Sequence, residues 1–211
     1  MVPLKKSIAV LFLEIQGGNK HAFDELFTAY HKRLIAFARQ YVNDQSTAQE
    51  IASGVFVNLW LKRATLNEVK KPEVYLYVAV KNAALNHLRS SKKRNLVIVE
   101  DNEETAVATG HHSGKQNELD HKELQAELQL AIAALPEQRR IIFKMVKEDG
   151  LKCREVAEIL GISTRTVESQ LYKAVKFLAD RLSIYLGYNP QKSGSGRSIS
   201  PGTLLNLFIT L

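Results

Sequence analysis

Residues 155–175, EVAEILGISTRTVESQLYKAV, contain two helical patterns on either side of a short turn. Gly161 can adopt the left-handed backbone conformation that a tight turn between helices requires. Ser163 can cap the helix that follows, and Ile162 and Val167 can fill the corner between the two helices. This stretch therefore predicts a helix-turn-helix.

The second helix of this motif has an apolar side and a polar side. In a helix-turn-helix the second helix lies in the major groove, so its outward side chains face base edges and phosphates. Glutamine can pair with adenine through both ends of its amide, and lysine can bind guanine or phosphate. An ordinary solvated face would carry the same residue types, and spacing alone leaves both interpretations open. The candidate duplex-binding residues are Arg165, Thr166, Glu168, Ser169, Gln170, Tyr172, Lys173 and Lys176.

Composition and charge restrict the class of protein. The 211 residues are 45% hydrophobic and 24% charged, as is usual for a soluble globular protein of one or two domains. Residues 1–94 contain fifteen Lys and Arg against seven Asp and Glu, whereas residues 95–125 contain two against seven. We interpret the basic excess as the footprint of a polyanionic partner, and the acidic segment as the separation between two folded regions.

The N-terminal block has the periodicity of helices. Asn19 follows two glycines and can cap a first helix. Ser46 and Gln49 have the spacing of a capping box, which predicts a second helix from near Thr47. In both helices apolar residues recur at spacings of three and four. In the first helix they are Phe23, Leu26, Phe27, Tyr30, Leu34, Phe37, Ala38 and Tyr41, and in the second they are Ile51, Val55, Phe56, Leu59 and Trp60.

A third helix is predicted from Val74 to Leu88, with Pro72 at its first position. Aromatic side chains beside basic and amide side chains can stack unpaired bases while the charges follow the nucleic-acid backbone. The alternative, in which the tyrosines belong to the core and the basic cluster ends a soluble helix, fits this segment equally well. The candidate single-strand-binding residues are Tyr75, Tyr77, Lys81, Asn82, Asn86, Arg89, Lys92, Lys93 and Arg94.

The segment from Asn95 to Asn117 has no helical period and is predicted to be a linker. Pro136 is expected to open a further helix, which Asp149-Gly150 would end. Before it, an apolar helical stripe resumes at Leu124, Leu128, Ile132 and Leu135. The chain is thus expected to be all-α, with two small helical domains.

Several classes of protein are excluded by what the sequence does not contain. The single cysteine rules out an intrachain disulfide and suits a reducing compartment, by default the cytoplasm. The apolar segments Ile8–Leu13 and Leu204–Leu211 are shorter than the roughly 20 residues that a bilayer requires. No phosphate loop, nucleophile elbow or metalloprotease motif is present, so we expect neither an enzyme nor a cofactor. The candidate metal ligands match no compact spacing, and we reject a metal site at His111, His112, His121 and Cys153.

The two blocks in this order resemble the two conserved domains of bacterial sigma factors of the extracytoplasmic-function (ECF) group. The resemblance covers about residues 15–187, and its form is most similar to sigma factors of Bacteroidetes. The motifs that carry it are Phe23-Asp24-Glu25-Leu26-Phe27, Ala48-Gln49-Glu50-Ile51, Tyr75-Leu76, Leu88-Arg89, Leu135-Pro136, Glu155-Val156-Ala157-Glu158 and Thr166-Val167-Glu168.

The resemblance implies an alternative sigma factor that binds core RNA polymerase, directs it to promoters and helps to open the DNA. Residues 1–94 would correspond to sigma region 2, residues 95–118 to the acidic linker, and residues 119–187 to sigma region 4. The helix that begins near Val74 would melt and read the minus-ten element, and the helix-turn-helix would read the minus-thirty-five element. The core-polymerase-binding residues would be Glu50, Ile51, Val55, Phe56, Leu59 and Trp60.

The chain departs from the family pattern at Ser53-Gly54, where the family usually places a polar-acidic pair. We expect weaker core binding than in typical relatives, because a carboxylate is missing and glycine weakens a helix by about 1 kcal/mol relative to alanine. Cys153 also departs from the pattern. A redox role for this residue is the alternative to inert packing.

Residues 188–211 extend beyond the resemblance. A segment rich in Pro, Ser and Gly leads to the apolar stretch Leu204–Leu211, which is an aggregation risk unless something covers it. We expect it to dock on the protein itself or on a partner, such as an anti-sigma factor or another DNA-targeting protein; a frayed tail is the alternative. The other interpretation of the whole chain is a stand-alone helix-turn-helix regulator, or a sigma factor whose targeting is delegated to a partner.

Overall fold

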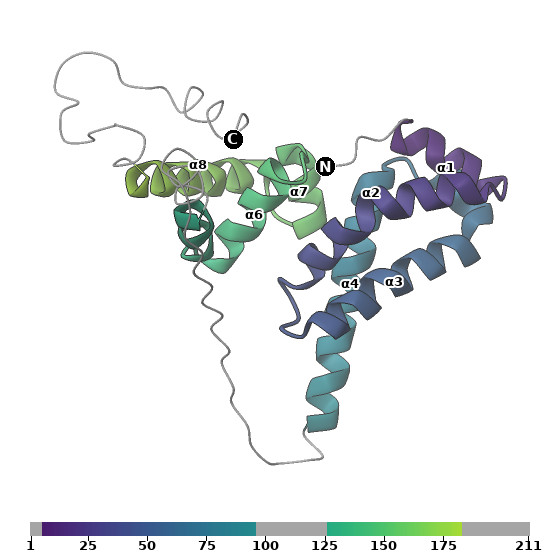
Figure 1. Ribbon diagram of the computed structural model, residues 1–211, viewed down its shortest axis with the longest axis horizontal. Coiled ribbons are helices and arrows are strands. Elements are labelled where there is room, and N and C mark those ends of the chain that lie inside the picture. The colour runs from purple at the N-terminus through teal and green to yellow at the C-terminus, as the bar shows by residue number, and fades with distance from the viewer. Residues whose placement is uncertain (1–5, 96–125, 183–211) are drawn as a thin grey trace, which may run out of the picture. The chain divides into compact units, whose positions relative to one another are not determined.

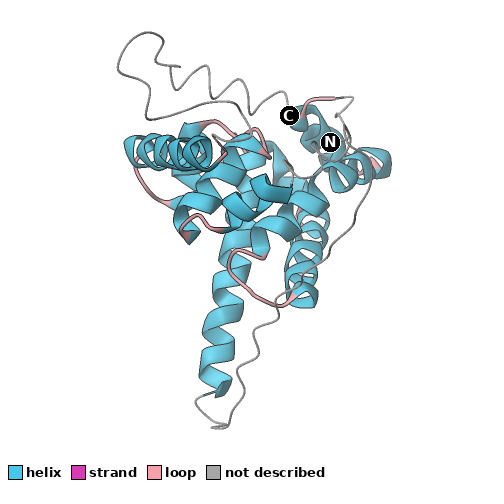
Figure 2. Cartoon of the chain, turned by 60° about the vertical axis from the view of Figure 1, so that its left-hand side comes forward, coloured by secondary structure: helices cyan, strands magenta, loops and turns pink. Residues whose placement is uncertain are grey.

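A computed structural model of the chain describes residues 6–95 and 126–182, and every regular element among these residues is helical (Figures 1 and 2). The predicted all-α fold is therefore confirmed. The acidic linker at residues 95–118, the histidines at 111, 112 and 121, and the apolar stretch Leu204–Leu211 lie outside the described residues, apart from position 95.

Helix α1 (Ile8–Gln16) opens the described chain, and the sequence analysis did not predict it. The Ser7 hydroxyl caps it by accepting a hydrogen bond from Val10 N at 3.4 Å. Leu11, Phe12 and Ile15 are buried. At nine residues the segment is too short for periodicity to identify a helix, and its stability comes from packing on α2, α4 and η1.

Helices α2 (Lys20–Ala38) and α3 (Gln45–Leu61) pack against each other. The predicted cap of α2 is confirmed, because Asn19 Oδ1 accepts from Ala22 N at 3.2 Å. The predicted capping box of α3 is wrong. Asp44 Oδ2 accepts from Thr47 N at 2.7 Å, so the helix begins at Gln45 and Ser46 lies inside it. The hydrogen bonds from Thr47 lower the pKa of the Asp44 carboxyl, so it caps the helix as a carboxylate, whose charge also interacts favourably with the helix dipole.

A 3-10 helix, η1 (Arg63–Glu68), leads to α4 (Pro72–Asn95), which packs on α1, α2 and α3. The prediction that Pro72 begins this helix is confirmed. The helix runs seven residues beyond the predicted end at Leu88, because no Gly or Pro stops it. Its core-facing residues are Val74, Leu76, Tyr77, Val80 and Ala84.

The C-terminal helices begin with residues 126–133, followed by α6 (Glu137–Lys147), α7 (Cys153–Leu160) and α8 (Thr164–Arg181). Pro136 stands immediately before α6, and Gly150 has a positive φ of 75° after it, so both predicted boundaries agree with the structure. Helices α6 and α8 pack against each other and bury Ile142, Met145 and Leu178.

The described part of the chain shows neither a membrane-spanning helix nor a cluster of metal ligands. None of its helices combines the length and the apolar character needed to cross a membrane. It also contains no group of three or more His, Cys, Asp or Glu side chains arranged to hold a metal ion.

Candidate nucleic-acid and partner-binding surfaces

The turn between α7 and α8 has the geometry that the sequence predicts. Gly161 has a φ of 74°, and its N–H donates to Ala157 O at 2.9 Å. The Ser163 hydroxyl accepts from Thr166 N at 3.0 Å and also lies 2.7 Å from Thr166 Oγ1. The first contact ends α7 and the second caps α8, as the local sequence of a helix-turn-helix predicts.

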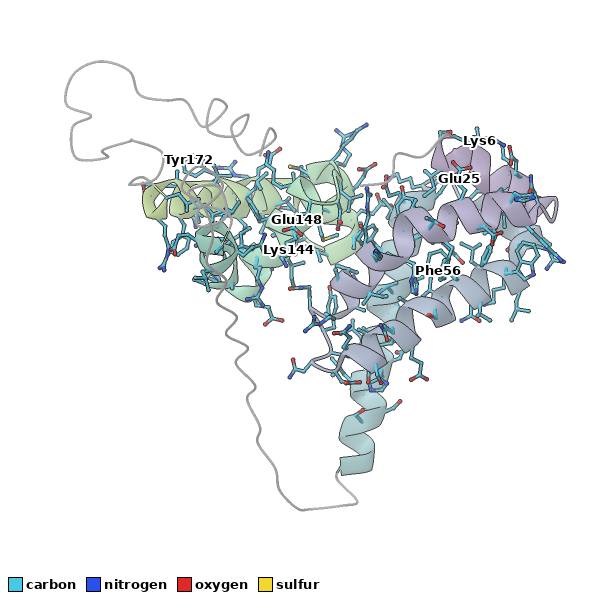
Figure 3. All side chains as sticks on the ribbon, in the orientation of Figure 1. Lys6, Glu25, Phe56, Lys144, Glu148 and Tyr172 are labelled. Atoms are coloured by element: carbon cyan, nitrogen blue, oxygen red, sulfur yellow. The ribbon has the colours of Figure 1, made fainter. Side chains whose placement is uncertain are left out.

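Helix α8 presents a polar face opposite its buried stripe. Val167, Leu171, Ala174, Val175 and Leu178 are buried, and Tyr172 on the other side is 53% exposed (Figure 3). Thr166 and Gln170 are half-buried at the edge of that stripe. The remaining candidate duplex-binding residues are all exposed, namely Arg165, Glu168, Ser169, Lys173 and Lys176. The face can therefore meet a DNA groove without rearrangement of the core.

Two side chains of other helices, Arg139 of α6 and Cys153 of α7, interact with residues of α8. Arg139, in the first turn of α6, donates from Nε to Gln170 Oε1 at 3.2 Å. Cys153, at the start of α7, is half-buried. Burial raises the pKa of its thiol, and the negative charge of Glu168 adds to this shift. A raised thiol pKa lowers the thiolate fraction at neutral pH, which favours inert packing over redox reactivity.

Helix α4 carries a second polar face. Asn82, Asn86 and Arg89 are exposed and follow one another at spacings of four and three, so they lie on one side of the helix. Lys81 is half-buried. Lys92, Lys93 and Arg94 belong to the last turns of the same helix. The predicted amide and basic residues are thus brought together on one element.

The two tyrosines of α4, Tyr75 and Tyr77, are less exposed than stacking on unpaired bases requires. Tyr77 has no exposed surface, and its ring meets Phe37 edge-on with centroids 5.0 Å apart. The Tyr77 ring therefore belongs to the core, as the alternative interpretation of this segment predicted, and it cannot stack on a base. Tyr75 is half-buried and meets Phe12 edge-on at 6.2 Å.

Most of the predicted polymerase-binding residues of α3 lie inside the protein. Ile51, Val55, Phe56 and Leu59 are buried, and Figure 3 shows Phe56 among the helices of the N-terminal block. Phe56 packs edge-on against Phe23 and Phe27. These four side chains belong to the core, and Trp60 is half-buried. The exposed residues of the helix, which could contact a partner directly, include Glu50, Val57, Asn58 and Leu61.

The outward side of α3 borders an apolar pocket of about 390 Å³. Val57 and Leu61 are 57% and 69% exposed, although both are apolar. The guanidinium of Arg63 lies over the Trp60 ring, 4.9 Å from its centroid. The sequence analysis missed Val57 and Leu61, whose only signal was that they are apolar positions outside the buried stripe. The lining residues are Lys20, Phe23, Asp24, Val57, Trp60 and Leu61.

His31 of α2 contacts Ser53 of α3, the residue before Gly54. Its ring stacks on Phe27 with centroids 4.2 Å apart, and its Nε2 lies 3.2 Å from Ser53 Oγ. Burial lowers the pKa of this imidazole. A Cβ added to Gly54 would have no heavy atom within 4 Å, so the surface at this point is open.

Comparison with known proteins explains this pairing of a helical body with a helix-turn-helix. Residues 26–94 match the model of "Sigma-70 region 2", and residues 125–178 match "Sigma-70, region 4", which together cover more than half of the chain. The chain belongs to the sigma-70 family. Its region 2 match contains most of α2, all of α3 and all of α4 except Asn95, and its region 4 match contains α6, α7 and most of α8.

Named relatives indicate the ECF group within this family. The RNA polymerase sigma-H factor of Pseudomonas aeruginosa is 25% identical over 165 residues, which are 76% of this chain and 86% of that protein. The ECF RNA polymerase sigma factor SigF of Caulobacter vibrioides is 24% identical over 183 residues, 86% of this chain and 97% of that protein. The resemblance that the sequence analysis drew is therefore confirmed at the level of the ECF sigma factors.

A solved structure supports the fold of this sigma factor. The sigma factor RpoE in complex with the anti-sigma factor NepR from Bartonella quintana is 15% identical, with a TM-score of 0.55. The match covers 77% of this chain and 97% of that one.

Proposed function

We propose that this protein is an alternative sigma factor that binds core RNA polymerase, directs it to specific promoters and promotes opening of the DNA. The observation that carries this proposal is the tandem match to sigma-70 regions 2 and 4, each of which supplies an exposed polar helix face. A sigma factor needs both faces, because one must read duplex DNA and the other must handle the melted strand.

Region 4 supplies duplex binding through α8. The exposed side chains of this helix include Arg165, Lys173 and Lys176, which can neutralise phosphates, and Ser169, which can contact a base edge. We assign these residues, with Thr166, Glu168 and Tyr172, to the minus-thirty-five element. The domain is taken to span residues 119–187.

Region 2 supplies single-strand binding through α4. Asn82, Asn86 and Arg89 can hydrogen-bond unpaired bases and follow the backbone, and Lys81 and the basic end of the helix add positive charge. We assign this face to the minus-ten element and assign Tyr77 to the core. The domain is taken to span residues 1–94.

The pocket beside α3 is proposed as the anchor for core polymerase. Exposed Val57 and Leu61 next to Trp60 form an apolar patch, and partner interfaces commonly centre on such patches. Trp60 is the single tryptophan of the chain and lies in the lining of this pocket. Immobilised protein should retain core polymerase from solution, and Val57→Asp should abolish the retention.

Two finer assignments belong to the same proposal. An anti-sigma factor is a second partner, since a related sigma factor has been crystallised with one. The origin in Bacteroidetes is proposed from the form of the motifs alone. The competing function is a stand-alone helix-turn-helix regulator, which would use α8 on duplex DNA and would leave the polar face of α4 without a nucleic-acid ligand.

Reconstituted transcription tests the proposal. Purified protein and core polymerase from a related bacterium are incubated with a pool of genomic promoter fragments, and the transcription start sites are mapped. Discrete starts that share two spaced upstream elements are expected. Core binding without discrete starts would indicate that targeting is delegated to a partner, and duplex binding without core binding would favour the stand-alone regulator.

A further inference from the structure

One contact between α6 and α8 determines how Gln170 can meet DNA. Arg139 Nε donates to Gln170 Oε1 at 3.2 Å, and both side chains are half-buried. A guanidinium carries only hydrogen-bond donors, so the amide must turn its oxygen toward Arg139. The Gln170 amide is therefore held in one orientation, with its NH₂ group directed away from Arg139.

This orientation disfavours adenine, the base that glutamine was expected to read. Adenine offers an acceptor at N7 and a donor at N6, so a bidentate pair needs both the oxygen and the NH₂ group of the amide. The oxygen of Gln170 already accepts from Arg139. This oxygen keeps a second lone pair, but the bond turns it toward Arg139, so the pair offers chiefly donors, from the Gln170 NH₂ group and the Arg139 Nη atoms, together with one positive charge.

The position of Gln170 on α8 favours the DNA backbone over the base edges. Gln170 precedes buried Leu171 and lies at the edge of the exposed face, on the side where α8 packs on α6. A recognition helix directs the centre of its exposed face toward the floor of the groove, where the bases lie. Its edges face the groove walls, where the phosphates run.

We propose that Arg139 and Gln170 together form a clamp for a single DNA phosphate, in which Arg139 supplies the charge and fixes the amide as a donor. A phosphate oxygen accepts hydrogen bonds only and is anionic, which matches this group of donors. The inference rests on the proposed duplex binding by α8 and removes Gln170 from the residues that select a base.

The neighbouring Arg140 provides a matched control. It is also half-buried in the first turn of α6, but its Nη1 donates to Ala133 O at 3.2 Å and so faces a different group. Arg139→Met and Arg140→Met remove the same charge from adjacent positions. Only the first should alter the contact between the protein and one phosphate.

The test uses the full chain bound to core polymerase on the promoter duplex found by start-site mapping. Phosphates of the upstream element are replaced one at a time by neutral methylphosphonates, and the affinity is measured for each duplex. Wild type should lose roughly tenfold at one phosphate, as expected for a hydrogen bond to a charged group. Arg139→Met should bind the unmodified duplex correspondingly less well and lose nothing further there, whereas Arg140→Met should keep the wild-type profile.

Other outcomes separate this inference from the proposed function. If Arg139→Met changes the preferred base at one position and keeps the methylphosphonate profile, the pair reads guanine and the clamp is wrong. If both arginine variants behave alike, the clamp is also wrong while duplex binding stands. If wild type binds no upstream element, the proposed function fails and the clamp fails with it. Arg139→Lys, which keeps the charge, should lose less affinity than Arg139→Met, and thermal unfolding of each variant checks that it folds.

Discussion

The Tyr30 hydroxyl donates to Glu73 Oε1 at 2.7 Å and thereby joins α2 to the first turn of α4. The two residues are 43 positions apart in sequence, and the tyrosine is only 3% exposed. The guanidinium of Arg33 lies 5.4 Å from the centroid of the same ring. This bond is a polar contact that holds α4, with its proposed DNA-binding face, in position on the N-terminal block.

Tyr30→Phe should lower the free energy of unfolding by about 1 kcal/mol, because the ring stays in place while a partly buried carboxylate loses its donor. Urea denaturation measures the effect. Tyr172→Phe is the control, since Tyr172 is 53% exposed and its substitution should change stability by less than about 0.5 kcal/mol. Equal effects of the two changes would contradict the stabilising role of the Tyr30–Glu73 bond.

Gly54→Ala should stabilise the protein by roughly 0.5–1 kcal/mol. Gly54 lies within α3, and a Cβ there meets no atom within 4 Å, so alanine adds helix propensity without a clash. Gly161→Ala is the matched control. Its Cβ also has open space, but its φ of 74° is strained for any L residue, and about 1 kcal/mol or more of stability should be lost. Chemical denaturation should give the two changes opposite signs.

Gly54→Glu tests whether the missing carboxylate weakens core binding. We expect tighter binding of core polymerase than for wild type, measured by titrating core polymerase over the immobilised protein. Gly54→Ala controls for the gain in helix stability, because it adds propensity without a charge. An affinity of Gly54→Glu no higher than that of Gly54→Ala would show that a carboxylate at this position makes no contact.

The stability of the protein should fall as the pH falls below about 6.5, in part because of His31. Burial lowers the pKa of its imidazole in the folded state, so the unfolded chain takes up the proton first. This contribution is present above the ordinary histidine pKa and is lost as the pH falls through the folded-state value. His31→Gln should show a smaller difference in Tm between pH 7.5 and pH 5.5, and the exposed His21→Gln should show the wild-type difference.

The combined change of Lys81, Asn82 and Arg89 to alanine should abolish promoter opening and spare duplex binding. Asn82 and Arg89 belong to the exposed face of α4, which we propose handles the melted strand, and half-buried Lys81 lies beside Asn82 on the same helix. Permanganate reactivity of unpaired thymines measures opening, and a template with a preformed bubble should restore transcription. Lys173→Ala in α8 is the reciprocal control, for which duplex binding should weaken. Failure of the bubble template to rescue the triple variant would point to a defect elsewhere.

Much of the fold was predictable from local sequence. Asn19, Pro72 and Ser163 each act within four residues of their own position, and the structure confirms the three helix starts that they predict. The start of α3 was missed although Asp44 also acts locally. Two polar residues, Asp44 and Ser46, competed for one cap, and the carboxylate bound the free amide.

The candidate site was predictable where one helix carries it. The exposed residues of α8 follow from the 3.6-residue period, because a single buried stripe determines the opposite face. Helix α3 was harder, because Val57, Trp60 and Leu61 are as apolar as the buried Val55 and Leu59. An apolar side chain on a helix with apolar residues on several sides does not itself say which neighbour covers it.

The sequence by itself determined the all-helical class, the helix-turn-helix and the polar faces of α4 and α8, since these depend on interactions between residues close in the chain. Only the tertiary structure decided that Tyr77 lies in the core, that Val57 and Leu61 border an open pocket, and that Arg139 meets Gln170 across 31 positions. Those outcomes depend on which helices pack together, and packing is set by the joint burial of surfaces far apart in sequence.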